Sequence, residues 1–330
     1  MAWPAPADSK TAVRRAGDRI RKKDFDQSDL DTLNRWRAAH GYIINTFQAN
    51  LRTRTKNTPI PVAQRLKRAM TIIDKLQNGR ALDLSSMQDI AGVRLVFPDI
   101  ESLIEFRGRS HQSRAQHQLV NDPAKYDYLA APKSSGYRGI HDIYRYKAGT
   151  LTGAKWDGLL IEIQYRTMVQ HAWATAVELS DALTANRTKF SQGAPDNQRF
   201  FHLCSELLAR RYEASVSCLP SASHQELVDE WTDIEQRCHF FQQLKSVGKQ
   251  GGDGDLRGFV ILIVQPEGEL LVEPQRSYRG AIHRLLALEA EHPDWDMVLV
   301  SGDKDESLRS AFRNYFRNAS EFVGLMEGAL

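Results

Sequence analysis

Short apolar runs alternate with amphipathic stretches through the first 185 residues, and this alternation restricts the possible folds most strongly. The run Ala91–Phe97, which Pro98 closes, is typical of a buried strand, and Ile140–Tyr146 and Leu159–Tyr165 follow the same pattern. Around these runs, apolar side chains recur at three- and four-residue steps, as in helices. We therefore predict an α+β fold with a mixed β-sheet flanked by helices.

Four helices are expected around these strands. The clearest begins near Leu30, because the apolar side chains from Leu33 to Leu51 fall on one helical face, and Ser28 is a candidate N-cap. The expected helices span about 30–51, 62–76, 100–111 and 167–185.

The sequence beyond residue 185 suggests two further parts. Helical periodicity runs from about 198 to 245 with a break near Pro220, and a Gly-rich stretch follows it. Strands are then expected at Phe259–Val264, Leu270–Val272 and Met297–Val300, with helices at 278–291 and from 306. The predicted division is a basic N-terminal segment (1–28), a catalytic domain (29–185), a helical connection (186–247), a linker (248–255) and a small αβ regulatory domain (256–330).

Composition narrows the class of protein. No apolar run reaches the roughly 18 residues of a membrane span, and residues 1–10 lack an apolar signal region, so we expect a soluble, cytoplasmic protein without a membrane partner. The three cysteines, Cys204, Cys218 and Cys238, are too widely spaced to indicate a disulfide framework or a zinc ribbon. Residues 1–80 hold 17 Lys and Arg against 7 Asp, although the whole chain carries only +3. Such a basic region suits nucleotide phosphates or nucleic acid, although solvated helix surfaces can look the same.

The candidate chemistry lies between Arg65 and Glu178. Glu162 and Gln164 are expected on the same side of one strand, and Asp89 stands at the entrance of another. Two carboxylates on neighbouring strands can hold Mg²⁺, which prefers oxygen ligands. Cations that could cradle phosphates surround them in the sequence. These cations are Arg65, Lys67, Arg68, Lys75, Arg94, Lys133, Arg138 and Arg166.

Four groups of residues follow one another in a fixed order. They are Arg65-x-Lys67-x-x-x-Thr71-x-x-x-Lys75, Asp89-Ile90-Ala91-Gly92-Val93-Arg94, Lys133-x-x-Gly136-Tyr137-Arg138-Gly139-Ile140-His141 and Glu162-Ile163-Gln164-Tyr165-Arg166-Thr167. Each group alone is a weak signal, but the ordered series resembles the synthetase domain of the RelA/SpoT family, the makers of (p)ppGpp, over about residues 30–185. The resemblance implies a pyrophosphokinase that moves the β,γ-pyrophosphate of ATP to a 3′-hydroxyl.

The resemblance also implies roles for the donor side of the site. Asp89 and Glu162 match the Mg²⁺ carboxylates, and Glu162 is also the candidate to accept the proton of the attacking hydroxyl. Arg65 and Arg94 match the arginines that sandwich the adenine of ATP. One helix face is expected to present Lys67, Thr71 and Lys75 to the ATP triphosphate.

On the acceptor side, Tyr137 matches the aromatic residue that stacks on the acceptor base, and Gly136 lets its loop approach closely. The remaining matched residues are polar and are expected to contact acceptor phosphates, ribose or the catalytic carboxylate. They are Lys133, Arg138, His141 and Gln164. His141-Asp142 looks like the metal pair of the family's hydrolase domain, but it lies inside the acceptor loop, so no hydrolase is predicted.

The sequence leaves the acceptor open. The basic N-terminal region and the stacking capacity of Tyr137 favour the 3′-CCA end of tRNA. The tail from Val298 to Phe322 resembles the fused toxin–antitoxin members called CapRel, in which a C-terminal region blocks the site until a phage protein relieves the block. That resemblance implies an autoinhibited, translation-blocking toxin in phage defence. GDP or GTP, or an adenine nucleotide, is the alternative acceptor. A catalytically silent RNA-binding sensor is disfavoured because Asp89 and Glu162 are intact.

Overall fold

In the computed structural model the chain forms two compact units. One comprises residues 1–131 and 139–168, and the other residues 132–138 and 169–330. No helix in the described part of the chain is long and apolar enough to cross a membrane. The described residues are 3–67, 69–113, 116–184, 194–250, 259–264, 270–277, 280, 284, 287–288, 291–292, 295–301 and 319–330.

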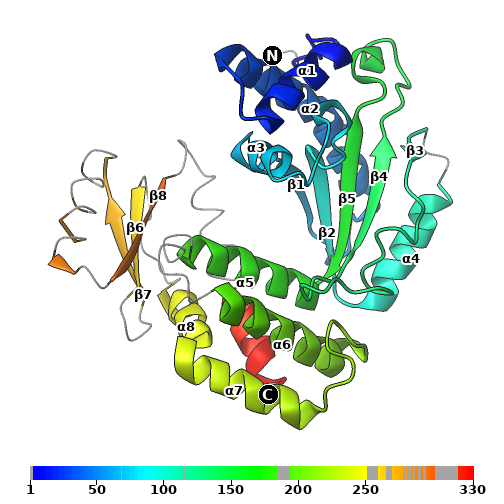
Figure 1. The fold of residues 1–330 in the computed structure, drawn as a ribbon. Helices are drawn as coiled ribbons and strands as arrows, with labels where there is room; N and C mark the ends of the chain where they lie inside the picture. The colour runs from blue at the N-terminus through cyan, green and yellow to red at the C-terminus, as the bar shows by residue number, and fades with distance from the viewer. Residues whose placement is uncertain are drawn as a thin grey trace. The chain divides into compact units, whose positions relative to one another are not determined.

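A five-stranded sheet forms the centre of the first unit, with strand order β1-β2-β5-β4-β3 (Figure 1). Strands β2 and β5 are parallel, whereas the other pairs are antiparallel, so the sheet is mixed and the predicted α+β class is confirmed. Apolar runs at the predicted places form the three inner strands, β2, β5 and β4. The bounds are β1 (Val62–Leu66), β2 (Ala91–Phe97), β3 (Gln118–Leu119), β4 (Ile140–Arg145) and β5 (Leu160–Thr167).

Helices complete the core of this unit. The predicted apolar face of α2 is buried from Leu33 to Leu51, and it packs in one cluster with side chains of β2 and β5. The N-cap of α2 is Asp26 and not the predicted Ser28, because the Asp26 carboxylate accepts from the Asp29 backbone N–H in a capping box. The helices are α1 (Lys10–Arg21), α2 (Gln27–Arg54), α3 (Ala69–Gln77), α4 (Ile100–His111) and the 3₁₀ turns η1 (Leu84–Ser86) and η2 (Gly153–Trp156).

The prediction of one helix from Val62 to Leu76 is wrong in its first part. Residues 62–66 form β1, which pairs with β2 so that Arg65 lies opposite Gly92 and Ala63 opposite Arg94. The helix begins only at Ala69. Strand β1 is largely exposed at the sheet edge, so it lacks the apolar pattern by which a buried strand is recognised.

The buried His40 of α2 makes the stability of this unit depend on pH. It is 1% exposed and its Nδ1 lies 2.7 Å from the Trp36 carbonyl oxygen. Burial lowers the pKa of His40 to about 4. The hydrogen bond to Trp36 raises the pKa, but by less than burial lowers it. The unfolded chain therefore binds one more proton than the folded chain between about pH 6.5 and pH 4, so stability falls on acidification.

We expect about 3 kcal/mol of folding free energy to be lost through His40 as the pH falls across that window. Urea unfolding of the wild type and of His40→Leu at pH 7.5, 6 and 5 measures the effect. The variant should lose less stability than the wild type over this range. Parallel losses in the two proteins would contradict the assignment.

The second unit is mainly helical. Its core is formed by α5 (Met168–Thr184), α6 (Ala194–Glu213), α7 (His224–Cys238) and α8 (Phe240–Gln250). Residues 319–327 form a last helix (Figure 1). Its Phe322 and Met326 are fully buried in the same core. Lys245 of α8 forms an ion pair with Glu327 at 2.6 Å. The C-terminus therefore packs with α6 and α8.

A three-stranded antiparallel sheet of order β7-β6-β8 lies within the same unit. It consists of β6 (Phe259–Val264), β7 (Leu270–Gln275) and β8 (Asp296–Ser301), which confirms the three predicted strands. The start of the predicted linker is helical, because α8 continues to Gln250, and residues 251–258 lie outside the described residues. So do most of the predicted helix at 278–291 and residues 306–318. The division into functional domains stays a prediction.

Candidate active site

Strand register places three of the predicted donor-side residues, Arg65, Arg94 and Glu162, on one face of the five-stranded sheet. Gly92 of β2 lies opposite Arg65 of β1 and Glu162 of β5, and Arg94 lies opposite Gln164. Directly opposed side chains of a sheet share one face. The predicted placement of Glu162 and Gln164 on the same side is confirmed, because the Gln164 Nε2 donates to the Glu162 Oε2 at 2.6 Å.

Asp89 lies just before β2 and binds two lysines. Its Oδ2 accepts from Lys67 Nζ at 2.8 Å and from Lys75 Nζ at 2.9 Å. Burial raises the pKa of Asp89, but the hydrogen bonds and charges of the two lysines outweigh burial and leave the pKa below its usual value. Asp89 is therefore ionised at neutral pH. Lys67 reaches it from the end of β1 and Lys75 from α3, so the predicted single helix face does not include Lys67.

Glu162 is the centre of a chain of polar contacts. The Glu162 Oε1 lies 2.9 Å from His141 Nδ1. The side chain of Gln164 donates to the other Glu162 oxygen, and its own Oε1 accepts from Arg94 Nε at 3.3 Å. Burial raises the pKa of Glu162 and the charge of Asp89 adds to this rise, but His141 and Gln164 outweigh both and lower the pKa.

The two carboxylates fit a divalent cation. Asp89 Oδ1 is buried and has no hydrogen-bond partner among the residues that the structure describes. An ionised oxygen buried in this way is costly without a compensating group, and Mg²⁺ prefers such oxygen ligands. Within the described ranges, no group of three or more His, Cys, Asp or Glu could hold a metal ion. Asp89 and Glu162 would therefore hold Mg²⁺ together with oxygens from a substrate or water.

Two further donor-side residues accompany the carboxylates. Thr71 lies one turn before Lys75 on α3, so the two side chains share a helix face. Arg65 is exposed on β1. The first unit thus contains five of the predicted cationic and hydroxyl side chains together with Asp89 and Glu162. They are Arg65, Lys67, Thr71, Lys75 and Arg94.

The predicted acceptor residues divide between the two units. His141 and Gln164 belong to the first, whereas Lys133, Gly136, Tyr137 and Arg138 belong to the second. Within the second unit, Lys133 Nζ lies 5.2 Å from the centre of the Tyr137 ring. This contact keeps a cation beside the aromatic face that was predicted to stack on a base.

Gly136 and Arg138 have structural roles inside the second unit. Gly136 has φ +84°, and a Cβ there would come within 3.0 Å of the Ser205 Cβ, so glycine is required by both conformation and packing. Arg138 is 4% exposed and forms an ion pair with Glu213 and a 2.9 Å hydrogen bond to the Ser215 hydroxyl. Their contacts with an acceptor stay predictions.

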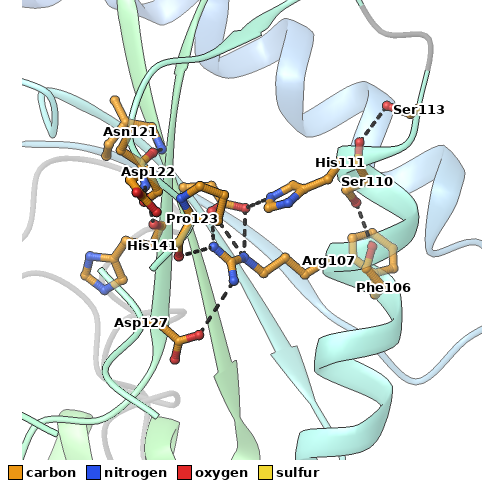
Figure 2. A network of polar contacts seen from close by, with 12 residues as sticks. Phe106, Arg107, Ser110, His111, Ser113, Asn121, Asp122, Pro123, Asp127 and His141 are labelled. Atoms are coloured by element: carbon orange, nitrogen blue, oxygen red, sulfur yellow. Dashed lines mark hydrogen bonds and ion pairs between the residues drawn. The ribbon is translucent and has the colours of Figure 1, made fainter. Parts of the chain in front are cut away.

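Sequence reasoning missed the buried network behind His141. Asp142 is fully buried and binds Arg107 Nη2 at 2.7 Å and His111 Nε2 at 2.7 Å, and Arg107 also donates to the Pro123 carbonyl oxygen. Figure 2 shows His141 turned away from Arg107 and His111. Adjacent residues of a strand face opposite sides, so His141 and Asp142 do not form a joint metal pair.

The mixed sheet, the two ionised carboxylates and the surrounding cations define an enzyme that acts on nucleotide phosphates. Comparison with known proteins identifies the family of enzymes to which the chain belongs. Residues 64–180 match the family described as "Region found in RelA / SpoT proteins". The matched segment contains every predicted site residue.

Relatives extend the match beyond that segment. An uncharacterized protein of Mycobacterium bovis is 30% identical over 220 residues, which cover 66% of this chain and 73% of the relative. GTP pyrophosphokinase YjbM of Bacillus subtilis is 32% identical over 116 residues, covering 34% of this chain and 52% of that protein. The small alarmone synthetase 1 structure from Bacillus subtilis aligns with a TM-score of 0.44 at 24% identity, over 55% of this chain and 92% of that one. The chain belongs to the RelA/SpoT family, and the prediction of a pyrophosphokinase is confirmed.

Proposed function

We propose that the chain transfers the β,γ-pyrophosphate of ATP to a 3′-hydroxyl at the cluster of Asp89 and Glu162. The observation that carries this proposal is the buried Asp89 Oδ1, which has no hydrogen-bond partner among the described residues, on a carboxylate whose other oxygen binds two lysines. Bound Mg²⁺ would neutralise negative charge on the phosphates. The family membership supports the same reaction class.

The residues of this cluster can account for each bond and proton that changes in the reaction. The oxygen of the 3′-hydroxyl forms a bond to the β-phosphorus of ATP, and the bond from that phosphorus to the oxygen bridging to the α-phosphorus breaks, so AMP leaves. Glu162 accepts the hydroxyl proton. Lys67, Lys75 and Arg94 offset the charge that develops on the phosphate oxygens. Most of the catalysis is positioning and electrostatics.

A guanine nucleotide, GDP or GTP, is the first candidate acceptor. Its support is the 32% identity with a protein named a GTP pyrophosphokinase, over a segment of 116 residues. The Tyr137 ring beside Lys133 can stack on a purine while the lysine offsets phosphate charge. An adenine nucleotide offers the same stacking surface.

The 3′ end of tRNA, which the sequence favours, is the second candidate. The excess of ten positive charges in residues 1–80 supports it, because phosphate contacts dominate affinity for nucleic acid. Several of these cations are held by aspartates within the first unit, among them Arg19 by Asp29 and Arg35 by Asp8. Such pairing reduces the positive charge that is available to RNA.

Parallel reactions with ATP labelled at the γ-phosphate separate these acceptors. Each contains Mg²⁺ and either GDP, GTP, ADP or bulk tRNA, and a control contains tRNA whose 3′-terminal ribose has been oxidised by periodate. Label on the guanine nucleotides supports the first acceptor. Label on intact tRNA that is lost after oxidation supports the second. Label on no acceptor, including ATP itself, would oppose the proposed function.

Regulation by residues 256–330 is a further part of the proposal. This region contains the separate sheet β6–β8 and lies outside the matched residues 64–180. We propose that it holds the enzyme inactive as a toxin in phage defence, with a phage protein as the trigger. The sequence of the tail supports this role.

A deletion tests the regulation. Removing residues 256–330 would also remove Phe322 and Met326 from the core of the helical unit, so the design keeps the last helix. Residues 256–317 are replaced by a flexible Gly/Ser linker of about 20 residues, which spans roughly 25 Å. Turnover should rise severalfold over that of the full chain. An equally active deletion variant with an unchanged melting temperature would exclude autoinhibition by the sheet region.

A further inference from the structure

Residues 132–138 form a segment of the second unit, here the acceptor loop, that carries four of the predicted acceptor residues. Lys133 is exposed and Tyr137 is half-buried. The two neighbours of Tyr137 in the chain, Gly136 and Arg138, are buried. The contacts of these two neighbours therefore set the position of the Tyr137 ring.

On one side of Tyr137, the backbone is bonded to helix α6. The Gly136 carbonyl oxygen accepts from the Ser205 hydroxyl at 2.5 Å. This bond uses the only hydroxyl proton of Ser205, so the Ser217 hydroxyl, 2.7 Å away, must donate to Ser205. Ser205 is 4% exposed, and the Ser217 backbone N–H donates to the fully buried Glu206 at 2.8 Å. Gly136 thus belongs to a continuous chain of buried hydrogen bonds.

On the other side of Tyr137, the Arg138 side chain is directed into the second unit. It forms an ion pair with Glu213 at the end of α6 and donates to the Ser215 hydroxyl at 2.9 Å. The Glu213 carboxylate also accepts from Gln170 Nε2 of α5 at 2.9 Å. Arg138 is 4% exposed, so its guanidinium would have to leave a buried ion pair to reach an acceptor, which is costly.

We propose that α6 positions the acceptor loop, with Ser205 and Glu213 as positioning residues and Arg138 as an internal anchor that does not contact the acceptor. Their contacts fix the backbone on both sides of Tyr137 before an acceptor arrives, and such preorganisation reduces the entropy lost on binding. Both positioning residues lie outside the matched residues 64–180. The inference rests on the proposed function in taking Tyr137 as the surface on which the acceptor base stacks.

The substitution Ser205→Ala tests the inference, with Ser180→Ala as the matched control. Ser180 of α5 is also buried, and its hydroxyl lies 3.1 Å from the side-chain oxygen of Asn197 on α6. Calorimetry with Mg²⁺ measures the binding of GDP, of bulk tRNA and of the ATP analogue with a methylene bridge between the α- and β-phosphates. Ser205→Ala should bind the acceptor about tenfold more weakly, because the buried Gly136 carbonyl oxygen loses its donor. Its affinity for the ATP analogue should stay unchanged.

Glu213→Gln provides a second variant, which removes the negative charge beside Arg138. It should also bind the acceptor more weakly and should melt at a lower temperature. If Glu213→Gln does not fold, Ser205→Ala decides by itself. In transfer assays, Ser205→Ala should raise the KM for the acceptor and leave the KM for ATP unchanged, whereas a general loss of structure would weaken both substrates.

Three results would overturn the inference. They are unchanged acceptor binding by Ser205→Ala, an equal loss of acceptor binding in Ser180→Ala, and a wild type that binds neither GDP nor tRNA. Failure of the proposed function gives a different result. If the wild type binds an acceptor, Ser205→Ala binds it more weakly and no protein transfers pyrophosphate, the inference stands and the proposed function fails by itself.

Discussion

Glu162→Gln and Asp89→Asn should each reduce turnover by about a hundred- to a thousandfold, the effect of removing one preorganised electrostatic group from an active site. Glutamine keeps the shape of Glu162 and can still contact His141, but it cannot accept a proton or hold Mg²⁺ by charge. Asparagine likewise keeps the shape of Asp89 beside Lys67 and Lys75 while removing its negative charge. Initial rates at saturating ATP and Mg²⁺ measure the effect.

Thr71→Val provides a comparison from the same region. It replaces a hydroxyl with a methyl group of similar size on the face of α3 that also carries Lys75, and it leaves both carboxylates in place. Its loss of turnover should be much smaller than that of either carboxylate variant. Near-normal turnover by Glu162→Gln or Asp89→Asn, in protein that melts like the wild type, would remove the carboxylates from the reaction.

Asp142→Ala should destabilise the first unit by about 3–5 kcal/mol, the usual cost of removing one partner of a buried ion pair. Asp142 is fully buried, and its loss leaves the buried Arg107 with a weaker carboxylate contact, Asp127 at 3.7 Å, and the Pro123 carbonyl oxygen. Hydrogen exchange of the β4 amides under increasing urea reports the loss locally. Because β4 carries His141, turnover should fall as well.

The control for Asp142 is an ion pair at the surface. Glu105 and Arg109 of α4 lie 3.2 Å apart with side chains 64% and 63% exposed, and such a pair contributes at most about 0.5 kcal/mol. Glu105→Ala should therefore leave β4 exchange nearly unchanged. Equal losses in the two variants would mean that the Asp142 network does not support the sheet.

Much of the first unit could be predicted because its signals are local. The apolar side chains of β2 and β5 are mostly buried and recur along each strand, so their pattern identifies the strands, although half-buried residues of the site alternate with them. The ordered motifs then identify the donor-side residues. The amphipathic face of α2 is equally local, whereas its N-cap was misassigned by two residues because several candidate caps stand close together in the sequence.

Long-range contacts account for what could not be predicted. Strand β1 is defined by its pairing with β2, about thirty residues later in the chain. The four-residue spacing of Lys67, Thr71 and Lys75 is typical of a helix, and it led to the wrong prediction for residues 62–66. Asp142 appears in the sequence as an ordinary polar residue of a strand. Only the fold brings it to Arg107, 35 residues earlier.

Paired labels on ATP test the central claim most directly. The full chain and Glu162→Gln are incubated with Mg²⁺, the mixed acceptors and ATP labelled either at the γ- or at the α-phosphate. Pyrophosphate transfer predicts that the γ-label moves to the acceptor while the α-label appears in AMP, and that both products are lost in Glu162→Gln. The α-label on the acceptor would instead show nucleotidyl transfer, and transfer that persists in Glu162→Gln would contradict the site.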